Sequence, residues 1–166
     1  MKDDYNYLVG IIAAHSNHKV PGRLRLQKTV KLLQSLNFPT SYNFSIHFYG
    51  PYSEDLQSDI GLLECLGLIK EHETTNAYGS SSYVFEAEPS CASEDMSGFK
   101  KYIEIMEKAP TDALELAATY VAYKEMGLEH QSALESVRRK KKDKLSSEQS
   151  ALKLLQDLRL LEPCVA

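Results

Sequence analysis

The amino-acid sequence predicts an α+β fold that is mostly helical, with a winged-helix-like core followed by an all-helical half. The first observation behind this prediction is the helical spacing of apolar residues over most of the chain. The second is an alternating strand, a turn and a helix start within residues 44–56. The third is a pair of strand-like runs at 68–73 and 82–88, joined by a polar, glycine-containing loop. Helix, strand, helix and β-hairpin wing in this order are typical of a winged helix.

The stretch 44–56 organises the first half of the chain. Phe44, Ile46 and Phe48 alternate with more polar residues, which is the period of a half-buried strand. The pair Gly50-Pro51 predicts a turn after this strand, because glycine accepts a positive φ and proline fixes its own φ. We therefore expect a strand that stops at a sharp turn and leads directly into a helix.

That helix is expected over residues 53–66. The Ser53 hydroxyl suits its N-cap, and Gly67 suits a left-handed residue at its end. Two earlier helices are expected at 5–15 and 23–36, with residues 20–22 in the connector between them.

The helix expected at 23–36 carries both apolar and basic residues. Its leucines and valine form one stripe, which we expect to face the core. Arg25, Lys28 and Lys31 recur every three residues without intervening acids, and we expect them on the outside of the helix.

The second half of the chain reads as helical throughout. Residues 89–93 read as a linker that separates a winged-helix-like domain at 1–89 from a helical extension at 94–162 packed on it. The extension is expected to contain four helices, at about 94–108, 112–126, 129–142 and 147–160.

Composition limits the function classes before any motif is considered. The chain has 166 residues, of which 43% are hydrophobic and 25% charged, which is ordinary for a globular domain. No run approaches the roughly 20 apolar residues of a membrane helix, and the first residues lack the pattern of a signal peptide. Cys65, Cys91 and Cys164 are too widely spaced to indicate a disulfide framework or a zinc site. We expect a cytoplasmic protein that contacts no membrane.

A family resemblance is carried by Arg25-Leu26-Gln27-Lys28, by the run from His47 to Ser53, and by Leu66 to Ile69. Together these segments resemble the YwgA-like family of small bacterial proteins. More distantly they resemble the Panacea domain of SocA-type antitoxins, in which an L-Q-K helix precedes a Y-G-P turn. The resemblance implies a winged-helix-like core with a helical extension and a regulatory or antitoxin-like role. It transfers no catalytic residue, because the shared motifs are turn and packing motifs.

Candidate chemical groups are few. His15 and His18 lie three residues apart but lack an acidic or cysteine partner at metal-ligand spacing, so we expect solvent-exposed histidines. Glu54, Asp55 and Asp59 resemble a carboxylate cluster, yet acids are favoured in the first turn of a helix in any case. No nucleophile-elbow, zinc-protease, phosphate-loop or dinucleotide motif is present. We expect no catalytic residue, cofactor or metal, and an enzyme is the weakest of three function classes.

The charge pattern decides between the other two classes. Over residues 53–88, eight carboxylates stand against Lys70, which gives this segment a net charge of −7. DNA affinity comes largely from Lys and Arg, so the helix at 53–66 is not expected to enter a DNA groove. We predict instead a regulatory module that binds a basic protein partner. The candidate partner-binding residues are Tyr52, Glu54, Asp55, Asp59, Glu71, Tyr78 and Glu86.

Basic residues lie outside this acidic segment and leave an alternative open. They line the helix at 23–36 and form the dense run 138–144, in which six of seven residues are cationic. The alternative is a DNA-binding regulator that uses these residues rather than the groove helix. Its candidate residues are Arg23, Arg25, Lys28, Arg138, Arg139, Lys140, Lys141 and Lys142.

Overall fold

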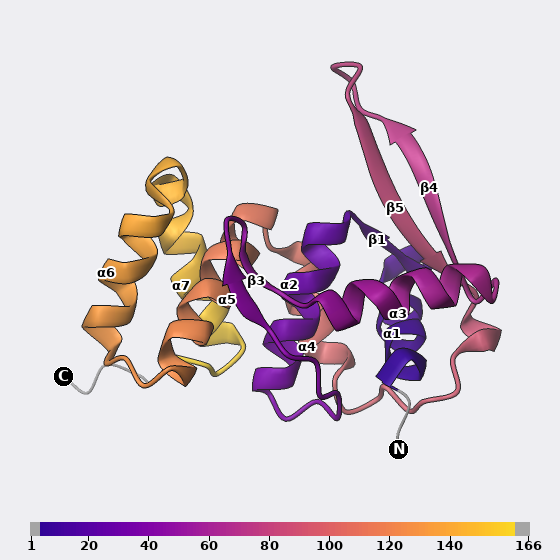
Figure 1. The fold of residues 1–166 in the computed structure, drawn as a ribbon, viewed down its shortest axis with the longest axis horizontal. Helices are drawn as coiled ribbons and strands as arrows, with labels where there is room; N and C mark the ends of the chain where they lie inside the picture. The colour runs from indigo at the N-terminus through magenta and orange to yellow at the C-terminus, as the bar shows by residue number, and fades with distance from the viewer. Residues whose placement is uncertain (1–3, 162–166) are drawn as a thin grey trace.

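The computed structural model describes residues 4–161, and within that range the protein is an α+β fold with seven α-helices. Cys164 and the last residue of the expected helical extension lie outside the described range. No helix in residues 4–161 is long and apolar enough to cross a membrane. The elements (Figure 1) are α1 (Asp4–Ala14), the 3₁₀ turn η1 (Ser16–His18), β1 (Lys19–Pro21), α2 (Arg23–Ser35), β2 (Ser45–His47), β3 (Gly50–Tyr52), α3 (Glu54–Cys65), β4 (Ile69–Thr75), β5 (Ser81–Ala87), η2 (Pro89–Cys91), α4 (Lys100–Lys108), α5 (Thr111–Glu125), α6 (His130–Lys140), η3 (Lys142–Ser147) and α7 (Glu148–Asp157).

The larger sheet is antiparallel and has the strand order β1-β5-β4. Val20 lies opposite Phe85, and Ile69 lies opposite Ala87, so the base of the sheet is buried while its far end is exposed. The far end of β4 and β5 projects well away from the helices (Figure 1). The two strands expected at 68–73 and 82–88 are confirmed, whereas β1 was expected to be a connector. Three residues ending in a proline are too short a run to show a strand period.

The smaller sheet is a two-stranded hairpin. Ser45 pairs with Tyr52 and His47 pairs with Gly50, so the turn lies at residues 48–49. The expectation of a turn at Gly50-Pro51 is therefore wrong, because this pair opens the second strand, although Gly50 has the expected positive φ of 85°. Phe48 was expected on the buried face but is 81% exposed at the hairpin tip.

Both ends of α3 lie where the sequence predicts them. The Ser53 hydroxyl accepts a hydrogen bond from Leu56 N at 3.3 Å, as an N-cap does. Gly67 ends the helix at φ 71°. In contrast, α4 begins at Lys100 and not at residue 94: residues 97–99 form a turn, and Ser97 N donates to the Asp95 carboxylate at 2.9 Å instead of to a helical carbonyl.

One buried apolar cluster runs through both halves of the chain, from Tyr7 on α1 to Leu158 beyond α7. Its centre is α5, where every residue from Ala113 to Ala122 is buried. This helix packs against α2, the hairpin, α6 and α7, which explains its run of small residues. Side chains from the segments 1–89 and 94–162 therefore share one core.

The basic residues of α2 correct another expectation. Arg25, Lys28 and Lys31 were expected on the outside, but all three are buried, and Lys28 is 0% exposed. The sequence pattern within α2 misses this because α4 and α5, encoded some eighty residues later, cover that face.

Candidate functional site

The L-Q-K segment of α2 holds the hairpin in place. The Gln27 side-chain amide donates to Ser53 O at 2.9 Å, and its carbonyl oxygen accepts from Ser53 N at 2.9 Å. The Lys28 ammonium donates to Pro51 O at 2.6 Å. Two consecutive side chains thus satisfy backbone groups of β3 and the α3 N-cap, which explains physically why the two motifs occur in one chain.

The other side of the hairpin rests on α5. A Cβ atom added at Gly50 would lie 2.5 Å from Thr119 Oγ1, closer than non-bonded atoms approach. The Thr119 hydroxyl itself donates to Glu115 O at 2.7 Å, which fixes it against the helix. Gly50 is therefore required twice, once for its positive φ and once for this close approach.

A buried carboxylate lies beneath the hairpin tip. Glu115, 0% exposed, accepts from Lys141 Nζ at 2.5 Å through one oxygen and from Lys144 Nζ through the other. Lys141 is buried too, and its ammonium also donates to Phe48 O. The junction of α6 and η3 thus reaches the hairpin through one lysine.

Lys28 belongs to the same buried neighbourhood. Burial lowers the pKa of Lys28 to about 8, with Glu115 opposing that shift and Lys141 and Lys144 adding to it. Its amine is fully covered and donates to a backbone carbonyl, so no substrate reaches it. The network fixes the position of the hairpin; it does not present a reactive group.

Outside this network lies a groove with aromatic walls. It has a volume of about 480 Å³ and borders the hairpin, α2 and the first turn of α3. Phe48 and Tyr49 are 81% and 58% exposed, and their rings meet edge to face with centroids 5.0 Å apart. We call this feature the aromatic groove; it is lined by Arg23, Leu24, Gln27, His47, Phe48, Tyr49, Tyr52 and Gln57.

The structure does not bring the predicted acidic residues into one uniform face. Tyr52 lines the aromatic groove, and Glu54 and Asp55 follow it as exposed residues in the first turn of α3. Asp59 is half-buried and accepts from the Tyr42 hydroxyl at 2.7 Å. Burial, and then this hydrogen bond, raises the pKa of Tyr42.

The remaining partner-binding candidates lie on β4, on β5 and in the loop between these strands. Glu71 accepts two hydrogen bonds from Arg23, at 2.6 and 2.7 Å. Glu86 contacts His72 at 2.9 Å and Lys19 at 3.9 Å. Tyr78 is exposed in the loop that joins the two strands. The net charge of −7 counted along residues 53–88 therefore overstates the local field, because Lys19 of β1 pairs with Glu86 and Arg23 of α2 pairs with Glu71.

The predicted basic residues are also divided by the fold. Besides Lys28 and Lys141, Arg25 is buried and donates to the carbonyls of Met106 and Ala109 at the end of α4. Arg138 pairs with Glu148 at 2.6 Å. The members of the run 138–144 that remain exposed without an acidic partner in the described residues are Arg139, Lys140 and Lys142.

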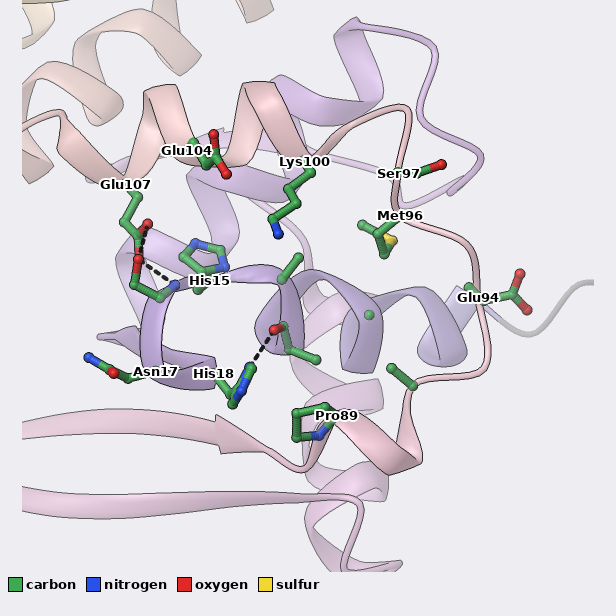
Figure 2. A pocket seen from close by; sticks show the side chains of 15 residues that line it. His15, Asn17, His18, Pro89, Glu94, Met96, Ser97, Lys100, Glu104 and Glu107 are labelled. Atoms are coloured by element: carbon green, nitrogen blue, oxygen red, sulfur yellow. Dashed lines mark hydrogen bonds between the residues drawn. The ribbon is translucent and has the colours of Figure 1, made fainter.

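A second cavity lies on another part of the molecule, between α1, η1 and α4, with a volume of about 500 Å³ (Figure 2). Its lining includes His15, which was expected to be exposed but is 3% exposed because it lies under α4. Within residues 4–161 no group of three or more His, Cys, Asp or Glu side chains is placed to hold a metal ion.

Sequence reasoning missed the groups that matter most to the hairpin. Phe48 and Tyr49 were assigned to a strand, and Glu115 was not singled out. One signal for Glu115 was present: it is a lone carboxylate between Leu114 and Leu116 in an otherwise apolar stretch, where only a paired charge is stable.

Comparison with known proteins gives one informative relative. The chain is 32% identical over 149 residues to "Uncharacterized protein YwgA" of Bacillus subtilis (strain 168). The matched region covers 85% of this chain and 89% of that protein. No family model matches the chain, and no solved structure matches it.

Proposed function

From the premise that this chain belongs to the YwgA family, we propose that it is a non-enzymatic regulatory module that binds a partner protein in the cytoplasm. The relative's name supplies no activity, so the proposal depends on the site. The observation that carries it is the aromatic groove. Its walls include the solvent-exposed rings of Phe48 and Tyr49, and the buried Lys141 fixes the backbone beneath them.

The exposed rings of Phe48 and Tyr49 favour a role in binding another protein, because exposed rings add little to the packing of the fold itself. Burying a Phe side chain against another protein contributes roughly 1.5–3 kcal/mol, and aromatic residues dominate the energetic centres of interfaces. The backbone beneath Phe48 and Tyr49 is fixed by Lys141, so little conformational entropy is lost when a partner binds. The groove volume of about 480 Å³ suits one or two anchoring side chains of the partner.

The proposed scaffold is a winged helix. The order α1, β1, α2, α3, β4, β5 and the pairing of β1 with β5 support this proposal. The distant resemblance to the Panacea domain extends it to an antitoxin-like role, in which the bound partner is a protein whose activity is blocked. Gln27 and Lys28 of the L-Q-K segment hold the backbone of Ser53 and Pro51, and Tyr49 of the Y-G-P segment lines the groove, so the two segments of the resemblance meet at the proposed binding site.

The partner surface is expected to be basic beside its apolar anchor. Glu54 and Asp55 are exposed within one turn of Tyr52, and no cation of the described residues pairs with them. Lys or Arg of the partner would relieve their mutual repulsion and increase the association rate. The carboxylates Glu71 and Glu86, already paired, and Asp59, hydrogen-bonded to Tyr42, are expected to contribute less.

The test is quantitative co-purification from the native cell followed by binding measurements with the recovered protein. A variant carrying Phe48→Ser and Tyr49→Ser is expected to lose that protein, with a dissociation constant raised at least tenfold. Met126→Ser is the matched control, because Met126 is also a large exposed apolar side chain but does not line the aromatic groove. Equal recovery by the groove variant and the control would refute the proposal.

The second candidate function is DNA binding through Arg139, Lys140 and Lys142. Their exposure beside one another supports it. This candidate predicts weak binding to duplex DNA that requires these three residues and disappears at moderate salt. Salt-sensitive duplex binding that is lost when these three residues are changed to glutamine, with no protein partner recovered, would favour this candidate over the first.

A further inference from the structure

The cavity between α1, η1 and α4 shares no lining residue with the aromatic groove, and its function is a separate question. Its floor is formed by the small residues Gly10, Ala13 and Ala14 of α1. Met96 borders the floor on one side and Pro89 on the other (Figure 2). A volume of about 500 Å³ lies within the range of small-molecule sites, and a floor of small side chains leaves room for a ligand.

The walls of this cavity are held in place by contacts of their own. The Glu107 carboxylate on α4 accepts from Ser16 N at 2.7 Å and from Ser16 Oγ at 2.9 Å. These two hydrogen bonds attach η1, the turn after α1, to α4. Gly10 permits a close approach of Met96, because a Cβ there would lie 3.0 Å from its sulfur. The site is therefore formed without a ligand.

One cation points into this space. The Lys100 side chain extends from α4 over the cavity, and its amine points toward the interior (Figure 2). Within residues 4–161 it has no ion-pair or hydrogen-bond partner. An exposed lysine that borders a cavity and has no carboxylate partner is available to an anionic group of a ligand.

A buried acceptor lies in the same wall. His15 Nδ1 is 2.7 Å from Ile11 O, and since a carbonyl only accepts, Nδ1 carries the proton. Burial lowers the pKa of His15, so the ring is neutral and Nε2 is an acceptor. Among the described residues, the buried His15 Nε2 has no hydrogen-bond partner. A buried acceptor without a donor costs folding free energy, and a hydrogen bond from a ligand or a water molecule would remove that cost.

We propose that this cavity binds a small zwitterionic amino carboxylate, with its carboxylate on Lys100 and its ammonium donating to His15 Nε2. The glutamates around the cavity, Glu94, Glu104 and Glu107, favour the ammonium and disfavour a dianion such as phosphate. The apolar part of the ligand lies over Ala13 and Ala14. The protein thereby acquires a metabolite site that is independent of the proposed partner binding.

The test is a thermal-shift screen of the full chain against each of the twenty amino acids, followed by calorimetry on the best binder. At least one amino acid is expected to raise Tm. Its N-acetyl and carboxamide derivatives are each expected to bind at least about tenfold more weakly, because each removes one charged contact. Inorganic phosphate is expected to give no shift.

Two variants and one control complete the design. Lys100→Met is expected to weaken binding about tenfold or more, and Ala14→Leu to abolish it by filling the floor. Lys101→Met is the matched control, because the neighbouring Lys101 lies over the Tyr102 ring and does not line the cavity. The absence of any shift with all twenty amino acids would overturn the proposal. Equal binding by Lys100→Met, or by the derivatives, would overturn it as well.

Discussion

At the scale of single residues, the most unusual feature is a set of charged side chains buried in the interior, where charged groups are rarely found. Lys28, Glu115 and Lys141 are buried, and each finds a carbonyl or a charge within hydrogen-bond distance. Such groups stabilise the fold less than apolar residues of the same volume would, but they impose one geometry on their partners. Here the partner is the backbone of residues 48–53.

Gly50 provides the first test of this arrangement. Gly50→Ala is expected to lower the free energy of unfolding by about 2–3 kcal/mol, because the strained φ and the contact with Thr119 both act against the methyl group. Gly67→Ala is the matched control: Gly67 also has a positive φ, but a Cβ added there would meet no atom within 4 Å. That change should cost only about 1 kcal/mol. Equal losses in urea denaturation would mean that the contact with Thr119 carries no weight.

Lys28 provides a pH-dependent test. Its pKa is about 8 in the folded protein and 10.5 in an unfolded chain, so between these values the unfolded state binds more protons. Stability from this group therefore rises with pH above about 8, by at most roughly 1.4 kcal/mol per pH unit. We expect the difference in unfolding free energy between the parent and Lys28→Met to move in favour of the parent from pH 8 to pH 10. A difference independent of pH would show that the lysine titrates normally.

At the scale of elements, the β2–β3 hairpin is the part that the rest of the fold supports. α2 contacts it through Gln27 and Lys28, α5 through Thr119, and the α6–η3 junction through Lys141. These contacts join segments up to ninety-three residues apart in the sequence. The aromatic tip of the hairpin is consequently an ordered feature of the surface.

Lys141→Met tests the longest of these connections. It leaves Phe48 O without its donor and Glu115 with one cation instead of two, so we expect a loss of about 3–5 kcal/mol. Lys142→Met, one residue later and exposed, should change stability by less than about 0.5 kcal/mol. Urea denaturation of the two variants measures the contrast. Similar values for both would mean that the buried pair does not hold the hairpin.

The sequence predicts elements well where periodicity is long and poorly where tertiary contacts decide. The helices of the second half follow a helical period, the strand-like runs at 68–73 and 82–88 are strands, and Ser53 and Gly67 mark the ends of α3 as expected. The three-residue strands β1 and β3 carry no period, so they were missed. Likewise the burial of α2's lysines depends on α5, which no local pattern within α2 reveals.

At the scale of the whole molecule, the electrostatic character comes from where the acidic and basic side chains lie and not from a large net charge. The net charge is only −4, yet the exposed acids at the start of α3 and the exposed cations near residue 140 lie on different elements. Each patch repels its own sign and attracts the opposite one, which gives the surface a preferred orientation toward a charged partner. The aromatic groove borders the acidic side of this arrangement.

The shared core yields the last prediction, that the chain folds as one cooperative unit. A fragment of residues 1–93 retains every strand but loses α5, whose buried face covers α2 and the hairpin. Lys28 would then be exposed together with the leucines beside it, and Gly50 would lose the surface on which it rests. We expect the fragment to lack a cooperative thermal transition and dispersed amide NMR signals, whereas the full chain shows a single transition by circular dichroism and fluorescence alike. A fragment that melts cooperatively would show that the first half is a domain in its own right. The network beneath the hairpin would then be a contact between two domains, and Lys141→Met would separate their transitions.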